Sequence, residues 1–92
     1  MAAEYEVRLL GPAETFLRGL EEDDREHVGR LLDLLEQDPR IDGRNKIIVM
    51  IPPVGFSLYA DSRFWILYHI VQNTTVSVLN IDRADTKITP WR

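Results

Sequence analysis

The stretch that decides the fold is Arg63-Phe64-Trp65-Ile66-Leu67-Tyr68-His69-Ile70-Val71. It is the longest β-type run in the chain, and it contains no glycine, proline or asparagine. β-Branched and aromatic side chains fit a pleated, half-buried surface. Apolar side chains occupy both alternation phases, which indicates a strand covered on both faces. The run therefore predicts the central strand of a small sheet.

The chain before this run predicts one strand and two helices. Residues 4–10 alternate between polar and apolar side chains, as a strand with one face on a core does. Gly11-Pro12 ends that strand, and a short amphipathic helix follows over Pro12–Leu20. A second helix opens at Glu21–Asp24 and stops at Asp38-Pro39, because the residue before a proline is pushed out of the α region.

The second helix has an apolar stripe at positions i, i+3, i+4 and i+7, formed by Val28, Leu31, Leu32 and Leu35. His27 lies beside this stripe. We interpret it as a solvated helix residue with no part in a site.

The chain around and after the central run predicts three more strands. They are Lys46–Ile51, Val54–Ala60 and Thr74–Asp82, and the first of them is expected to be well buried because it holds five consecutive apolar residues. The order β-α-α-β-β-β-β predicts an α+β, two-layer fold, with a helical hairpin packed on one face of a mainly antiparallel sheet. The other face is expected to be partly open and lined by the more basic half of the chain. Whether the tail around Trp91 covers it is left open.

The bulk properties limit the classes of protein that fit. Ninety-two residues predict a single domain over 1–92. The absence of cysteine excludes disulfides and thiolate metal sites, and two isolated histidines are too few for a histidine-based zinc site, so no metal or cofactor is expected. We expect no signal peptide, because the N-terminus has no charged region followed by an apolar run, and no apolar stretch reaches the roughly 18 residues that span a bilayer. We therefore expect a cytoplasmic protein without a membrane partner.

The charge is divided unevenly along the chain. Residues 1–38 hold eleven acidic and four basic residues, whereas residues 39–92 hold seven basic and four acidic ones. Such asymmetry can mark an interaction surface. It also follows from amphipathic helices that carry acids on their wet faces, and both interpretations stay open. The overall charge of −4 argues against a general affinity for nucleic acid.

No compact catalytic motif is present: there is no nucleophile elbow, no glycine-rich phosphate loop and no histidine pair on a helix. A loose set of polar residues lies on or beside the predicted strands: Arg40, Arg44, Lys46, Tyr59, Arg63, Tyr68, His69, Asn80, Asp82, Arg83 and Lys87. Arginine and lysine in this set could bind phosphate, and histidine or tyrosine could transfer a proton. The same residues also fit purely structural roles in a core and at its edges.

The ordered combination of elements and local patterns resembles the RelE/ParE superfamily of bacterial toxins from type II toxin–antitoxin modules. The resemblance covers nearly the whole chain. Its clearest parts are the aromatic strand ending in Leu67-Tyr68 and the stretch Val78-Leu79-Asn80-Ile81-Asp82-Arg83; the opening strand, Pro12-Ala13, the passage from Leu34 to Arg40 and Asn45-Lys46 add to it.

The resemblance implies one of three functions. The first is a RelE-like toxin that inhibits translation by ribosome-dependent mRNA cleavage, with Arg83, His69, Arg63 and Lys87 as catalytic candidates and Arg40, Arg44, Lys46 and Tyr59 as RNA-binding candidates. The second is a ParE-like toxin that binds gyrase. The third is a non-toxic relative that binds an antitoxin without catalysis. A cognate antitoxin protein is the implied partner, with the ribosome and mRNA added in the first case. The resemblance also implies that Trp65 stands where an arginine is usual, so the basic site would be a degenerate one.

Overall fold

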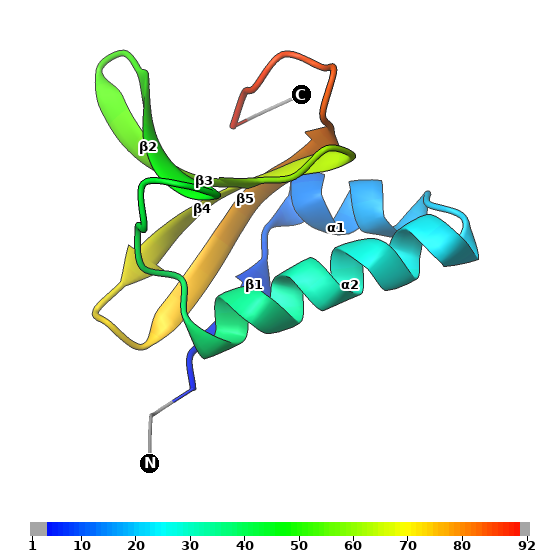
Figure 1. The fold of residues 1–92 in the computed structure, drawn as a ribbon, viewed down its shortest axis with the longest axis horizontal. Coiled ribbons are helices and arrows are strands. Elements are labelled where there is room, and N and C mark those ends of the chain that lie inside the picture. Colours follow the sequence, from blue (N-terminus) through cyan, green and yellow to red (C-terminus); the bar gives the residue numbers. More distant parts are fainter. Residues whose placement is uncertain (1–3, 91–92) are drawn as a thin grey trace.

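The structure, a computed structural model, describes residues 4–90 and contains five strands and two helices (Figure 1). In chain order they are β1 (Glu6–Leu9), α1 (Gly11–Arg18), α2 (Glu22–Gln37), β2 (Lys46–Ile51), β3 (Val54–Ala60), β4 (Phe64–Val71) and β5 (Thr75–Arg83). This confirms the predicted element order and the α+β class.

One five-stranded sheet has the order β1-β5-β4-β3-β2. β1 runs parallel to β5, and the other neighbouring pairs are antiparallel. β4 is therefore the middle strand, as its two-sided apolar pattern predicts. The tight turn that joins β4 to β5 uses Gln72 and Asn73 at φ 55° and 58°, which is the left-handed geometry of the primed turns that hairpins favour.

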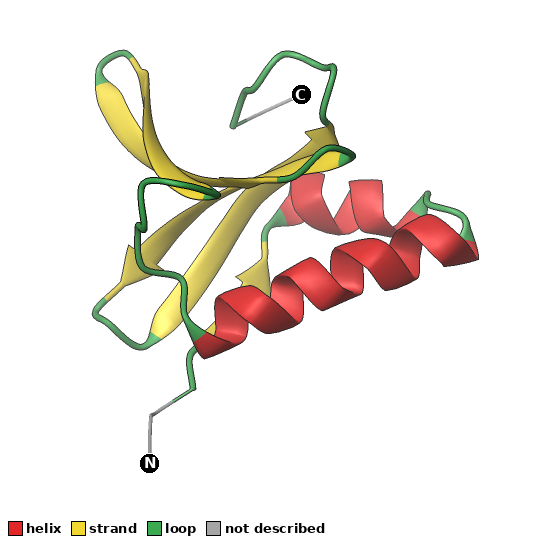
Figure 2. Cartoon of the chain, in the orientation of Figure 1, coloured by secondary structure: helices red, strands yellow, loops and turns green. Residues whose placement is uncertain are grey.

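Both helices cover the same side of the sheet (Figure 2). α2 buries the side chains of Val28, Leu31 and Leu35 completely or nearly so, as its periodicity predicts. They pack with Phe64, Ile66 and Tyr68 of β4 and with Val76, Val78 and Ile81 of β5. The main core therefore lies between the two helices and the middle of the sheet.

The face of the sheet away from the helices is apolar and covered, which corrects the expectation of an open basic face. A second core cluster there contains Phe56, Leu58, Trp65 and Leu67, with Ile88 of the C-terminal tail packed against it. The tail crosses this side of the sheet (Figure 1). The physical reason is that four large apolar side chains on one face need a cover, and the tail supplies it. Trp91 lies outside the described residues.

Two polar contacts tie the tail to the sheet. The indole Nε1 of Trp65 donates a hydrogen bond of 3.0 Å to Oγ1 of Thr86. The side-chain nitrogen of Asn80 donates one of 2.8 Å to the carbonyl oxygen of Thr89. Both donors are on strands and are themselves buried, so the position of the tail follows from satisfying them.

β2 is much less buried than its composition predicts, and that expectation was wrong. Ile48 and Met50 are each 66% exposed. β2 is an edge strand, and the β2–β3 hairpin extends away from the helices, so no helix covers this part of the sheet (Figure 1).

Candidate functional site

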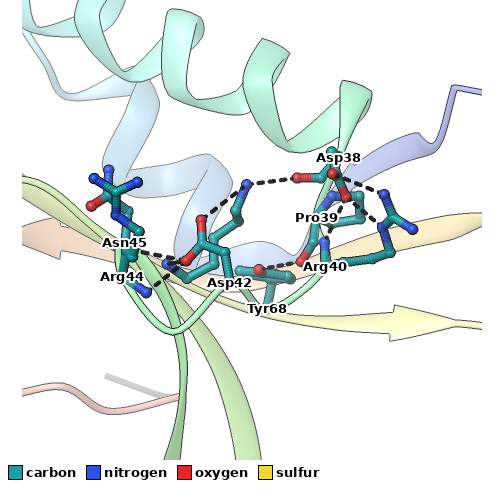
Figure 3. Close-up of polar contacts among 8 residues, drawn as sticks. Asp38, Pro39, Arg40, Asp42, Arg44, Asn45 and Tyr68 are labelled. Carbon is teal, nitrogen blue, oxygen red and sulfur yellow. Dashed lines mark hydrogen bonds and ion pairs between the residues drawn. The ribbon is translucent and has the colours of Figure 1, made fainter.

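The loop between α2 and β2, residues 38–46, is held in one shape by Asp42 (Figure 3). One oxygen of its carboxylate, Oδ1, accepts hydrogen bonds from the backbone N–H groups of Arg44, Asn45 and Lys46 at 2.8, 3.1 and 3.0 Å. An aspartate that caps successive backbone donors fixes a turn in this way. The three N–H donors lower the pKa of Asp42 although burial opposes them. The loop is therefore an ordered platform.

Three of the four RNA-binding candidates, Arg40, Arg44 and Lys46, lie on this platform, and the fourth, Tyr59, packs against it from β3. Arg40 makes two side-chain hydrogen bonds to the carboxylate of Asp38, at 2.9 and 3.2 Å. Hydrogen bonds from Arg40 lower the pKa of Asp38 to about 2. The ammonium of Lys46 lies 3.0 Å from the carbonyl oxygen of Asp38 and 5.6 Å from the ring centre of Tyr59.

Arg44 differs from the other two cations of the platform. It is exposed, and within residues 4–90 its guanidinium makes no ion pair. Tyr59, by contrast, is buried under Lys46, so its ring supports the platform from below. Of the four residues, Arg44 is the one whose charge is fully available to an anionic ligand.

A second cluster joins α2 to the ends of β4 and β5. The guanidinium groups of Arg63 and Arg83 both donate to the carboxylate of Asp24 on α2. They also lie over the buried ring of Phe64, at 5.7 and 5.4 Å from its centre. We call Arg63, Arg83, Asp24 and Phe64 the arginine cluster. Burial raises the pKa of Asp24, but the hydrogen bonds and charges of Arg83 and Arg63 outweigh it, so this pKa lies below its usual value.

A histidine–aspartate pair, His27 with Asp61, borders the arginine cluster, and sequence reasoning missed it. Nε2 of His27 lies 2.6 Å from Oδ2 of Asp61, and the His27 ring lies 5.8 Å from the ring of Phe64. His27 is therefore not a solvated residue: its side chain is 19% exposed. The one available signal was its spacing of three residues from Asp24, which places both on the same helix face.

The other two catalytic candidates lie apart from the arginine cluster. His69 is on the far face of the sheet, where its ring is 4.8 Å from that of Phe56. Lys87 is exposed in the tail. The structure thus brings Arg63 and Arg83 together and places His69 elsewhere.

Within the part of the chain that the structure describes, no three histidine, aspartate or glutamate side chains are grouped so as to hold a metal ion. Neither helix among residues 4–90 is long and apolar enough to cross a membrane.

Comparison with solved structures identifies the architecture. One chain of the toxin–antitoxin complex RelBE2 from Mycobacterium tuberculosis has a TM-score of 0.73 and 23% sequence identity, over 87% of this chain and 98% of that chain. This chain has the RelE fold. No protein-family model and no curated protein sequence matches it.

Two further solved structures have the same RelE fold. The archaeal RelE–RelB complex from Pyrococcus horikoshii matches with a TM-score of 0.71 and 13% identity, over 91% of this chain and 99% of that chain. The isolated RelE toxin of E. coli matches with a TM-score of 0.66 and 22% identity, over 90% of this chain and 87% of that chain. The fold expected from the sequence resemblance is thereby confirmed.

Proposed function

We propose that this chain is the toxin of a type II toxin–antitoxin pair and that it inhibits translation in the cytoplasm by cutting mRNA on the ribosome. The observation that carries the proposal is the RelE fold, matched over almost the full length of a chain from the RelBE2 complex. A cognate antitoxin protein is then its regulatory partner, and the ribosome and mRNA are its targets. Two of the solved neighbours described above are themselves toxin–antitoxin complexes.

The arginine cluster supports the chemical part of the proposal. Cleavage of a phosphodiester needs positive charge where the phosphorane forms. Arg63 and Arg83 place two guanidinium groups against a single carboxylate, that of Asp24, so these three groups together carry one net positive charge. Their side chains are 46% and 52% exposed, so a phosphate group can reach them.

The platform of residues 38–46 supports the binding part. Arg44 offers an available cation to the RNA backbone, with Arg40 on the same loop paired to Asp38, and backbone contacts supply most of the affinity for nucleic acid. Tyr59 lies beside this platform with Lys46 over its ring; burial and then the negative charges of Asp61 and Asp42 raise the pKa of its phenol.

The test is expression of the chain without any antitoxin, followed by measurements of growth, amino-acid incorporation and mRNA cut sites. We expect translation to stop, with cuts at the codon in the ribosomal A site. Arg83→Ala should reduce cutting by a factor of about 10²–10³, the usual cost of one charge-stabilising donor. Arg8→Ala is the matched control, because Arg8 is an exposed arginine on β1 whose one ion pair among residues 4–90 is with Glu6.

Three outcomes would contradict the proposal or part of it. Normal growth would mean a non-toxic relative of the toxins. Intact translation with DNA damage would mean a gyrase-binding toxin. Cutting that persists in Arg83→Ala would remove the site assignment while leaving the activity in place. His69→Gln and Lys87→Ala test in the same assay the two catalytic candidates that lie outside the arginine cluster.

A further inference from the structure

The carboxylate of Asp61 is held in place from two sides. Its Oδ1 accepts hydrogen bonds from the backbone N–H groups of Arg63 and Phe64, at 2.8 and 2.9 Å. Its Oδ2 faces Nε2 of His27 at 2.6 Å. The turn between β3 and β4 therefore presents a fixed acceptor to a histidine on α2, 34 positions earlier in the chain.

This acceptor determines which nitrogen of His27 carries the proton. Burial raises the pKa of Asp61, but the backbone donors and His27 outweigh burial, so the carboxyl group is ionised near neutral pH. An ionised carboxylate only accepts, so Nε2 of His27 must be the donor. Nδ1 then carries the lone pair of the neutral ring and faces the guanidinium of Arg30 at 3.5 Å. A carboxylate that fixes one ring nitrogen orients the ring as in a general base, and the exposed side chain of Arg30 lies beside the other nitrogen.

The surroundings of His27 are those of an anion site. The rings or guanidinium groups of His27, Arg63 and Arg83 all lie within 5.8 Å of the ring centre of Phe64. The charged groups that face the histidine are Arg30 on its own helix, Asp61 in the β3–β4 turn and, across Phe64, the two arginines with Asp24. A phosphodiester held by the two arginines would therefore lie across the Phe64 ring from His27.

We propose that His27, oriented by Asp61, is the proton-transfer residue of the RNA-cleaving site. The proposal rests on the function proposed above, and its ligand is a ribonucleotide phosphodiester with a free 2′-hydroxyl group. Nδ1 of His27 takes the proton of the 2′-hydroxyl as that oxygen bonds to phosphorus. The bond from phosphorus to the 5′ oxygen breaks, and its electron pair leaves on that oxygen, which takes a proton from water. The imidazolium then returns its proton to water, so the products are a 2′,3′-cyclic phosphate and a 5′-hydroxyl end.

His27 and Asp61 have different roles in this scheme. His27 contacts the reacting hydroxyl group and is catalytic. Asp61 acts through the histidine and is a positioning residue, so Asp61→Asn should slow cutting by disturbing the ring's tautomer and orientation. Exchange of the 2′-hydroxyl for hydrogen at the cut nucleotide should abolish cleavage by the wild-type protein.

The experiment measures single-turnover cutting of an mRNA on purified ribosomes by the full chain and by His27→Gln and His27→Ala. We expect both variants to be folded by circular dichroism and to cut about 10²–10⁴ times more slowly, the range that general acid–base catalysis contributes. Free imidazole should restore cutting by His27→Ala, because it can enter the vacated space and accept the proton. Glu26→Gln, an exposed change at the neighbouring position of α2, is the control for substitution in the helix.

Each other outcome overturns the inference. Cutting by His27→Gln within about threefold of the wild-type rate would exclude a role in proton transfer, since that role is worth far more. Slow cutting that imidazole does not restore, together with a lowered melting temperature, would mean that the pair only fastens α2 to the β3–β4 turn. Retained activity in the wild-type protein separates these failures from a failure of the proposed function, in which the wild-type protein itself does not cut.

Discussion

The hydroxyl group of Tyr68, on the middle strand of the sheet, donates a hydrogen bond of 2.6 Å to the carbonyl oxygen of Pro39. Both residues are fully buried. Burial, followed by the charges of Asp42 and Asp38, raises the pKa of Tyr68, so its phenol stays protonated and remains a donor well above neutral pH. This contact anchors the platform of residues 38–46 to the core (Figure 3).

Tyr68→Phe should therefore destabilise the protein. The change leaves the buried carbonyl oxygen of Pro39 without its donor, which costs about 1–3 kcal/mol of unfolding free energy. Urea unfolding followed by circular dichroism measures this loss. Tyr59→Phe is the matched control, because within residues 4–90 the Tyr59 hydroxyl makes no hydrogen bond to another residue. Equal losses in the two variants would show that the bond to Pro39 contributes nothing.

The charge on Asp38 should make stability depend on acid pH. The pKa of Asp38 is about 2 in the folded protein, whereas an unfolded chain has a value of about 3.9. A lowered folded-state pKa stabilises the protein above the unfolded value and is lost as pH falls through the folded one. The difference in unfolding free energy between wild type and Asp38→Asn should thus shrink between pH 5 and pH 2, on the scale of these two values.

Hydrogen bonds from Arg40 are the main cause of the lowered pKa of Asp38, so removal of Arg40 is the control. In an Arg40→Ala background the Asp38→Asn change should show a much weaker dependence on pH over the same range. The measurement is urea unfolding at several acid pH values at constant ionic strength. A difference that stays constant with pH in the wild-type background would contradict the assignment to Asp38.

The element order could be read from the sequence because its signals are local. Gly11-Pro12 and Asp38-Pro39 stop a strand and a helix by backbone chemistry alone, and alternation marks the strands wherever they pair. The burial of β2 could not be read in this way. Its composition matches that of a covered strand, but its exposure depends on its place at the edge of the sheet, and on helices that end before reaching it.

The site could be predicted only in part for a similar reason. Arg63 and Arg83 were identifiable as cations near strand ends, but their shared partner Asp24 is 39 and 59 positions away. Likewise, no residue near His27 in the sequence indicates that Asp61 will be its partner. Contacts between side chains so distant in sequence are set by the packing of α2 on the sheet, whereas the platform of residues 38–46 is a local loop that brings its own capping aspartate.

Two isoleucines on different strands should contribute very differently to the free energy of unfolding. Ile48 on β2 is 66% exposed, whereas Ile66 on β4 is completely buried. Ile66→Ala should cost about 2–5 kcal/mol of unfolding free energy, because it removes buried methyl groups and leaves a cavity. Ile48→Ala should cost less than about 1 kcal/mol, since little apolar surface leaves the interior. Denaturant unfolding of the two variants checks this, and comparable losses would mean that β2 is covered in solution.

The position of the C-terminal tail should depend on Thr86, whose hydroxyl group makes two hydrogen bonds. Its Oγ1 accepts from the indole of Trp65 at 3.0 Å and donates to the carbonyl oxygen of Arg83 at 2.7 Å. Thr86→Val keeps the shape of the side chain but removes both bonds, and the indole N–H of a side chain that is 2% exposed loses its partner. The expected loss of unfolding free energy is about 1–3 kcal/mol, because an unpaired buried donor keeps its desolvation cost.

Hydrogen exchange in Thr86→Val should also quicken over residues 84–90, since Ile88 covers the far-face cluster only while the tail is held in place. Thr74→Val, which alters an exposed hydroxyl in the β4–β5 turn, is the control. Unchanged exchange in Thr86→Val would show that packing of Ile88 alone fixes the tail.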